Sequence, residues 1–267
     1  MKVALIQMNS QGDKARNLEQ ARALIERAVA EERPDFVALP EIWTVLTEND
    51  AEKRAAAEPV PGGEAYGLLQ ELAARHRIVL HGGSIIERDG DAIYNTTVVF
   101  DRDGRELARY RKLHLFDIVT PDGKEYRESA TFTRGARAVC FDALGTRIGL
   151  SICYDLRFPE LYLQLAKQGA KVILVPAAFT LQTGKDHWEV LLRARAIETQ
   201  TYVLAPAQWG RYAGGARACY GHTLIADPWG HVIAKAQDKV GYIAARLDLE
   251  EVERVRARMP CADHRVL

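Results

Sequence analysis

Three polar side chains in the chain each follow an apolar segment, and their types suit nucleophilic catalysis at a carbonyl carbon. Glu41 follows residues 37–40 (VALP), Lys112 follows a strand-like segment, and Cys153 follows residues 148–152 (IGLSI). A free thiol is only slightly ionised at neutral pH, so Cys153 needs a base such as a glutamate to remove its proton. A lysine ammonium could stabilise the oxyanion that forms when the sulfur attacks. Each residue alone has a plainer interpretation, as a packed thiol or as a charged side chain that faces water.

The remaining cysteines and histidines near these segments indicate no metal site. The spacing of the four cysteines matches neither a disulfide framework nor a CxxC metal motif: Cys140, Cys153, Cys219 and Cys261. We expect the thiols other than Cys153 to be packing residues. His81, His114 and His187 lie on apolar elements, where a histidine is usually a hydrogen-bonded structural residue.

The bulk composition is that of a soluble globular protein. The chain has 267 residues, of which 48% are hydrophobic and 27% are charged, and its formal net charge is 36 − 36 = 0. A neutral chain has no overall field that would draw it to nucleic acid or to anionic lipid, so we expect neither partner. The amino terminus lacks the features of a signal peptide, and no stretch approaches 18 apolar residues. We therefore expect a cytoplasmic protein without a membrane span.

Helical and strand-like patterns alternate along the whole chain, without linkers or repeats. Helical spacing of apolar residues predicts helices over residues 17–32, 64–77, 159–168, 187–199 and 249–258. Apolar runs predict strands over residues 2–8, 35–39, 78–86, 92–101, 107–113, 147–153, 171–175, 201–205, 222–226, 231–234 and 242–246. This alternation, with hairpin turns between several strands, predicts a mixed α/β fold with helices outside the sheet layers. We expect a single domain over residues 1–267, and the strand order stays open.

Three sequence blocks carry a family resemblance. LPEIW (residues 39–43), YRKLHLFD (residues 110–117) and CYDLRFPE (residues 153–160) closely resemble, in order and spacing, the motif blocks of the nitrilase-like carbon–nitrogen hydrolases. Further segments extend the resemblance to nearly the whole chain, among them YRESATFTRG (residues 126–135) and YGHTLIADPWG (residues 220–230).

The resemblance implies roles for four residues and an architecture. Glu41 corresponds to the general base, Lys112 to the catalytic lysine and Cys153 to the nucleophile, and Glu128 matches a second glutamate that supports the site. The family fold is an αββα sandwich of two sheets between helices, which dimerises into a larger layered assembly. No metal or organic cofactor takes part, and a homo-oligomer is expected.

The block TGKDHWE (residues 183–189) resembles the branch of ω-amidases and deaminated-glutathione amidases. This implies a thiol-dependent amidase that hydrolyses the distal amide of a small keto acid or a deaminated-glutathione-like substrate through a cysteine thioester. Arg157 is the candidate partner of the substrate carboxylate, because a guanidinium matches a carboxylate bidentately; an ion pair with Glu160 or Asp155 is its structural alternative. Thr183 could add a hydrogen bond, and the backbone N–H of Tyr154 could face the oxyanion.

Several alternatives stay open at this point. Another hydrolase of the same family, namely a carbamoylase, an aliphatic amidase or a nitrilase, would use the same three groups. A catalytically silent dimeric binding protein on this fold is a further alternative. The loop over residues 208–219 matches no known pocket, and it is where a peptide-like substrate tail would be selected. The loop over residues 119–126 is individual to this chain.

Overall fold

Two β-sheets packed face to face form the centre of this computed structural model, which describes residues 1–120 and 123–266. The first sheet has eight strands: β1 (Lys2–Gln7), β2 (Phe36–Ala38), β3 (Glu58–Pro59), β4 (Val79–His81), β5 (Ile85–Asp89), β6 (Ala92–Phe100), β7 (Glu106–Arg111) and β18 (Gly241–Arg246). The strands follow the order β18-β1-β2-β4-β6-β5-β3, and β7 pairs with β6.

The second sheet has six strands, in the order β10 (Val139–Ala143), β11 (Thr146–Leu150), β12 (Val172–Leu174), β13 (Tyr202–Ala205), β16 (Leu224–Ala226) and β17 (Val232–Lys235). Two small hairpins add the pairs β8 (Asp117–Val119) with β9 (Glu125–Arg127), and β14 (Trp209–Tyr212) with β15 (Arg217–Tyr220). The helices are α1 (Lys14–Glu32), α2 (Asp50–Ala56), α3 (Glu64–His76), α4 (Pro159–Lys167), α5 (Leu181–Thr199) and α6 (Leu249–Arg258). Short 3-10 turns are η1 (Glu128–Ala130), η2 (Cys153–Arg157) and η3 (Ala213–Gly215).

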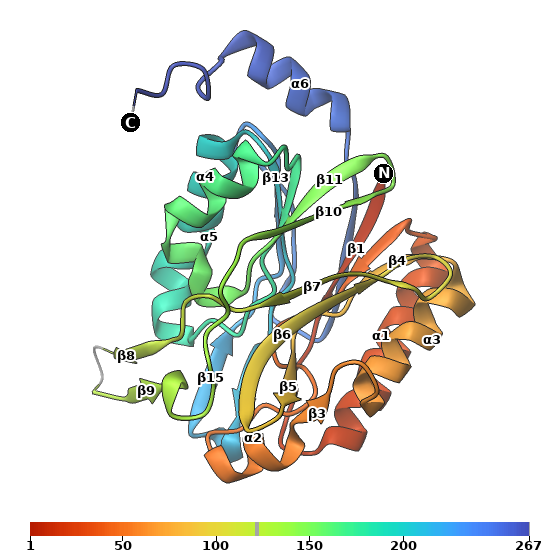
Figure 1. Cartoon of the computed structure of the whole chain (residues 1–267), viewed down its shortest axis with the longest axis vertical. Coiled ribbons are helices and arrows are strands. Elements are labelled where there is room, and N and C mark those ends of the chain that lie inside the picture. Colours follow the sequence, from red (N-terminus) through yellow and green to blue (C-terminus); the bar gives the residue numbers. More distant parts are fainter. Residues whose placement is uncertain (121–122, 267) are drawn as a thin grey trace.

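The first sheet is buried on both faces. Along β1, Val3 and Leu5 belong to the core between the sheets, whereas Ala4 and Ile6 belong to the core under α1 and α3. Successive side chains of a strand point to opposite faces, so an uninterrupted apolar run is what such a buried strand requires. Figure 1 shows α1 and α3 on the outer side of this sheet and α4 and α5 on the outer side of the other.

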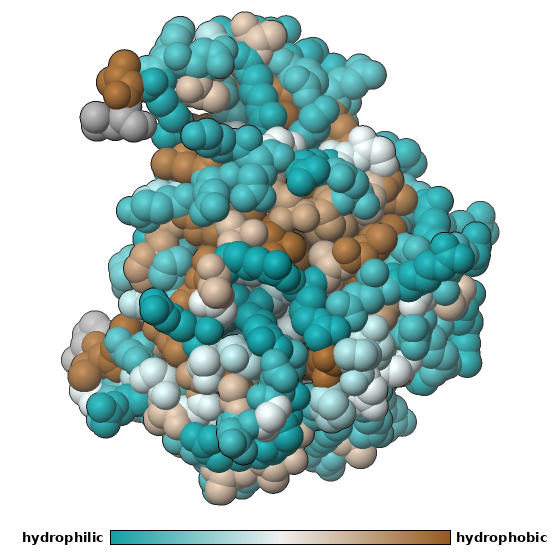
Figure 2. Space-filling model, viewed as in Figure 1, coloured by the Kyte–Doolittle hydropathy of each residue, from teal (hydrophilic) through white to brown (hydrophobic). Residues whose placement is uncertain are grey.

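The second sheet is covered by α4 and α5, which pack into the same core. Leu161 and Leu165 of α4 and Trp188 and Leu192 of α5 are buried there. Pro159 begins α4 at the first helical position, where a missing N–H costs no hydrogen bond. On the face seen in Figure 2, hydrophilic side chains predominate and an apolar band crosses the middle, over β10 and β11.

Parallel strands bring the ends of distant segments to one place. β1, β2 and β4 run parallel in the first sheet, and β11, β12 and β13 run parallel in the second. Sites in α/β sheets form outside the carboxyl ends of such strands. Glu41 lies just after β2 and Cys153 just after β11, so the sandwich places both at the ends of central strands.

The expected layered αββα arrangement is confirmed, and most predicted elements are present within a few residues of their expected bounds. One predicted strand, residues 78–86, is wrong, because the chain breaks at Gly82 and Gly83 between β4 and β5. Gly83 has φ +58°, and a Cβ atom there would lie 2.0 Å from the carbonyl oxygen of Pro40. The break therefore makes room for the segment that carries Glu41.

Other boundaries also differ from the predictions. The helix expected at residues 187–199 begins at Leu181, where the Thr180 hydroxyl accepts a hydrogen bond from the backbone N–H of Thr183. Sequence patterns did not predict α2, β10 or the two small hairpins. The loop over residues 119–126 is described except for residues 121–122, and residue 267 of the predicted domain also lies outside the described residues.

Candidate active site

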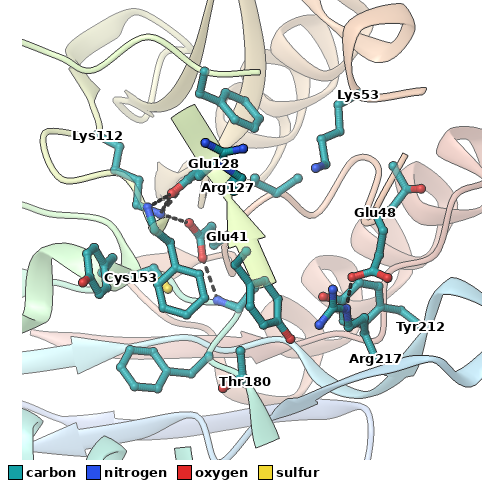
Figure 3. Close-up of a pocket in the computed structure, with 18 of the residues that line it drawn as sticks. Glu41, Glu48, Lys53, Lys112, Arg127, Glu128, Cys153, Thr180, Tyr212 and Arg217 are labelled. Atoms are coloured by element: carbon teal, nitrogen blue, oxygen red, sulfur yellow. Dashed lines mark hydrogen bonds and ion pairs between the residues drawn. The ribbon is translucent and has the colours of Figure 1, made fainter. Parts of the chain in front are cut away.

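Cys153 lies at a sharp turn between β11 and α4. Its backbone has φ +47°, a left-handed conformation that is uncommon for a residue with a side chain. Two hydrogen bonds hold the turn: the Cys153 N–H donates to the carbonyl oxygen of Pro176 (2.9 Å), and the Ile152 N–H donates to the carboxylate of Asp155 (2.8 Å). The turn directs the thiol into a cavity, as Figure 3 shows.

Glu41 faces the same cavity from the other sheet. Its Oε2 accepts a hydrogen bond from the backbone N–H of Ala178 (2.8 Å), and its Oε1 accepts one from the Asn95 amide (2.9 Å). The following residue, Ile42, has φ +43°, and its N–H donates to the Ser84 hydroxyl at 2.9 Å. The carboxylate is thus fixed by contacts on both of its oxygens.

Lys112 joins Glu41 to Glu128. Its Nζ lies 2.9 Å from Glu41 Oε1 and 2.8 and 3.0 Å from the two carboxylate oxygens of Glu128. Glu128 in turn accepts hydrogen bonds from the Phe116 N–H (2.6 Å) and the Asn95 amide (3.2 Å). One ammonium therefore lies between the buried Glu41 carboxylate and the Glu128 carboxylate, whose side chain is 11% exposed. Figure 3 shows these contacts as dashed lines.

This charge arrangement determines which groups carry protons. Burial alone would lower the pKa of Lys112, but the negative charges of Glu128 and Glu41 outweigh it and raise this pKa well above its usual value. Burial raises the pKa of the Cys153 thiol well above its usual value; Glu41 raises it further, whereas Lys112 lowers it. The resting site therefore holds a charged lysine and a protonated thiol.

Asp155 is a site residue that sequence reasoning did not single out for the site. It is fully buried and accepts hydrogen bonds from the Tyr110 hydroxyl (2.7 Å) and the His114 N–H (3.0 Å), and its Oδ1 lies 2.7 Å from His114 Nδ1. Tyr110 and His114 flank Lys112 in sequence. Asp155 thus ties the Lys112 segment to the Cys153 turn.

The cavity has a volume of about 420 Å³, within the ~300–1,000 Å³ range of small-molecule sites. Besides Glu41, Lys112, Glu128 and Cys153, its wall includes the predicted residues Tyr154 and Thr183. Arg157 is not part of the wall: its guanidinium lies 3.3 Å from His187 Nδ1 and 5.2 Å from the ring centre of Phe179. The carboxylate of Asp155, an alternative partner of Arg157, is occupied by the contacts described above.

Sequence reasoning missed most of the cavity wall beyond the motif blocks. Glu48, Asp50 and Lys53 come from the β2–α2 connection and α2, and Tyr212 and Arg217 come from the β14–β15 hairpin. The only signal was that residues 208–219 matched no known pocket and carried arginines. Among the described residues, no cluster of histidine, cysteine, aspartate and glutamate is arranged to hold a metal ion. In the same part of the chain, no helix is long and apolar enough to cross a bilayer.

The αββα sandwich and the convergence of a cysteine, a glutamate and a lysine define a nitrilase-type protein. The chain belongs to the carbon–nitrogen hydrolase family, whose model matches residues 2–257, and it is a hydrolase of carbon–nitrogen bonds. It is 44% identical over 269 residues to the deaminated glutathione amidase of Synechocystis sp., which covers 98% of this chain and 97% of that protein.

Two further comparisons agree with this assignment. The chain is 37% identical over 274 residues to omega-amidase NIT3 of Saccharomyces cerevisiae, covering 99% of this chain and 93% of that one. The crystal structure of Saccharomyces cerevisiae Nit3, a member of branch 10 of the nitrilase superfamily, superposes with a TM-score of 0.90. That match has 35% sequence identity and covers 100% of this chain and 97% of the other. The resemblance read from the motif blocks is confirmed.

Proposed function

We propose that this protein is an amidase that hydrolyses the distal amide of a small keto acid or a deaminated-glutathione-like compound through a Cys153 thioester. The names of the relatives, deaminated glutathione amidase and omega-amidase, support this substrate class. The observation that carries the proposal is the convergence of Cys153, Glu41 and Lys112 at the buried end of one cavity. No step of the proposed reaction requires a cofactor.

Acylation begins with a neutral thiol, since the pKa of Cys153 is raised. Glu41 takes the thiol proton as the sulfur attacks the amide carbon, so negative charge moves from the carboxylate to the carbonyl oxygen. Lys112 and the backbone N–H of Tyr154 stabilise this oxyanion, and one such donor is worth roughly 3 kcal/mol in a preorganised site. Glu41 then gives its proton to the nitrogen, the carbon–nitrogen bond breaks, and ammonia or an amine leaves.

Deacylation reverses these roles with water. Glu41 takes a proton from a water molecule that attacks the thioester carbon, and the same donors stabilise the second oxyanion. The carbon–sulfur bond breaks, the sulfur recovers its proton and the carboxylic acid leaves. Glu128 keeps Lys112 charged and in place throughout, because it holds the ammonium with both carboxylate oxygens.

The acyl-side contacts are also proposals. Thr183 lines the cavity and can donate a hydrogen bond to the substrate, and its hydroxyl lies 2.7 Å from that of Thr180. Arg157 can bind the carboxylate of the keto acid only if its guanidinium turns away from His187 toward the cavity. Among the described residues, the Arg157 guanidinium has no ion pair that this turn would break; it contacts His187 and the Phe179 ring.

We also propose a single domain over residues 1–267, a homodimer or higher oligomer, and a cytoplasmic location. Four exposed apolar side chains support oligomerisation: Val190, Ile197, Trp229 and Ile233. The turn with Trp229 packs on α5, since the Arg193 guanidinium donates to the Gly230 carbonyl at 2.7 Å. Apolar side chains gathered on one face of this kind mark an interaction surface, and a second copy of the chain is the proposed partner.

Product release across a substrate panel tests the reaction class. Wild-type protein would be assayed with keto-acid ω-amides, simple aliphatic amides, nitriles and carbamoyl amino acids, with Cys153→Ala as the matched control. We expect the highest kcat/KM for the keto-acid amides and no turnover by the variant. Activity confined to nitriles or to carbamoyl compounds would refute the proposed substrate class. The absence of turnover on the entire panel would favour a silent binding protein.

A further inference from the structure

The cavity continues past Glu41 to a second polar group of residues that the proposed chemistry does not use. Arg217 of β15 and Tyr212 of β14 are direct neighbours in the hairpin register, and both line the cavity together with Glu48. Figure 3 shows Arg217, Glu48 and Tyr212 together, on the opposite side of Glu41 from Cys153. We refer to these three residues as the distal group.

The Arg217 guanidinium is held in place by several contacts, but one of its nitrogen atoms makes no hydrogen bond to a described residue. Its Nε donates to Glu48, its Nη2 donates to the carbonyl oxygen of Glu125 (3.1 Å), and its Cζ lies 4.2 Å from the ring centre of Tyr126. Its Nη1 is buried and has no hydrogen-bond partner among the residues that the structure describes. A buried polar group without a partner is costly, so a ligand oxygen that accepts from Nη1 would be stabilised there.

The direction of the cavity shows which part of a substrate reaches Arg217. Glu41 must lie within hydrogen-bond reach of the departing nitrogen in order to protonate it. The amine portion of the substrate therefore extends past Glu41, toward the distal group. The acyl portion lies on the other side, near Cys153 and Tyr154. An oxygen that meets Arg217 consequently belongs to the leaving amine.

The charge of this wall favours recognition through hydrogen bonds. Each cation in it already has a carboxylate partner: Arg217 with Glu48, Lys53 with Asp50 (2.8 Å) and Arg127 with Glu125 (3.4 Å). Positive and negative charges balance in these three pairs, so they create no strong field. The donor on Arg217, rather than net charge, is the selective feature.

We propose that Arg217 forms a leaving-group subsite, in which its Nη1 donates a hydrogen bond to an oxygen of an amino-acid or peptide amine. This inference rests on the proposed amidase function and narrows it. It assigns the enzyme to amides whose nitrogen is the amino group of an amino acid or peptide, with a carboxylate or peptide carbonyl oxygen as the acceptor. Ammonia has no such oxygen and cannot use the subsite.

Three amides of one keto acid test the proposal, with ammonia, glycinamide or glycine as the leaving group. Arg217→Gln should raise KM about 10- to 100-fold for the compound whose leaving group is glycine. This change corresponds to the loss of one hydrogen bond to a charged group. KM for the primary amide should not change. The glycinamide compound separates the two acceptors: an effect as large as with glycine indicates a carbonyl oxygen, and a smaller one indicates the carboxylate.

Controls keep the test independent of folding. Arg211→Gln alters an exposed arginine of the same hairpin that lies outside the wall of this cavity, and it should leave all three KM values unchanged. Arg217→Lys keeps the positive charge but loses the planar fork, so it should also raise KM for the glycine and glycinamide compounds only. It replaces Arg217→Gln in the test if that variant fails to fold.

Two results would overturn the subsite. One is an equal loss with all three amides, and the other is a wild-type enzyme that cleaves only the primary amide. The second result would leave the proposed amidase function intact. If the wild type cleaved none of the three compounds, the proposed function itself would fail.

Discussion

The two ends of the cavity contain similar charged side chains that differ in how deeply they are buried. At the catalytic end, the Lys112 and Glu41 side chains are 2% and 4% exposed, and each has several hydrogen-bond partners. At the distal group, the side chains of Arg217 and Glu48 are 14% and 36% exposed. The proposed catalytic residues Glu41, Lys112 and Cys153 follow strands of the two sheets, whereas the distal group comes from the β14–β15 hairpin and the β2–α2 connection. Chemistry here is placed on the rigid sandwich and selectivity on the segments around it.

Removing Cys153, the proposed nucleophile, should have the largest effect on activity. Cys153→Ala should lower kcat by at least ~10⁴-fold, as expected when one member of a catalytic set is removed. The melting temperature should change little, because only one small side chain is lost. Steady-state kinetics and thermal unfolding measure the two quantities. Retention of a substantial rate would exclude the thioester route.

Lys112→Met should have the next largest effect. Lys53→Met makes the same substitution at the other end of the cavity, so the two variants compare the ends directly. We expect Lys112→Met to lower kcat by about 10²–10³-fold through loss of an oxyanion donor. It should also destabilise the fold by about 3–5 kcal/mol, because the buried Glu41 and the partly buried Glu128 lose the cation between them.

Lys53→Met, at the distal end, should cost only about 0–1 kcal/mol, since its pair with Asp50 is partly exposed. Urea denaturation of both variants measures the contrast. A change in KM alone for Lys112→Met, or equal destabilisation by the two variants, would contradict the distinction between the ends.

Asp155→Asn should show how far the catalytic end depends on positioning. The variant keeps the side-chain shape but replaces an acceptor oxygen with a donor, against the Tyr110 hydroxyl or the Ile152 N–H. We expect a loss of about 1–3 kcal/mol in stability and a fall in kcat of up to about 100-fold at nearly constant KM. Tyr110→Phe removes one of these contacts and should have a smaller effect. An Asp155→Asn effect on KM alone would argue against a positioning role.

The smallest expected effect is a pH dependence of stability that belongs to Cys153. Its pKa is raised in the folded state, so the folded protein binds this proton more tightly than the unfolded chain does. The resulting stabilisation is complete below the unfolded thiol pKa of about 8.5 and is lost as pH rises above it, by up to about 1.4 kcal/mol per pH unit. The stability of wild type relative to Cys153→Ala should therefore fall between neutral and alkaline pH. A constant difference would mean that the thiol is not perturbed.

The sequence predicted the fold layers and the catalytic end because both depend on local patterns. Apolar runs such as residues 2–8 predict strands buried on both faces, and strand ends predict where polar side chains meet. The three motif blocks then indicated Glu41, Lys112 and Cys153. The break at Gly82 and Gly83 was not predictable from periodicity, because it depends on a close approach to Pro40 that is distant in sequence.

Selectivity residues were harder to predict for a related reason. Arg157 was the natural candidate because it adjoins the nucleophile in sequence, but the η2 turn points its guanidinium toward His187. Arg217 reaches the cavity through the β14–β15 hairpin, whose pairing has no clear period in the sequence. The sequence indicates Asp155 only as an ion-pair partner of Arg157. Its hydrogen-bond donors, Tyr110 and His114, come from a segment about forty residues away, so no local pattern reveals them.

Intact-mass analysis of the protein during turnover tests the central claim most directly. Wild-type protein would be mixed with a keto-acid amide, quenched with acid and digested to locate any adduct. We expect an acyl group on Cys153 that hydroxylamine removes, and no adduct on Cys153→Ala. Turnover without an acyl-enzyme, or an adduct on another residue, would contradict the account.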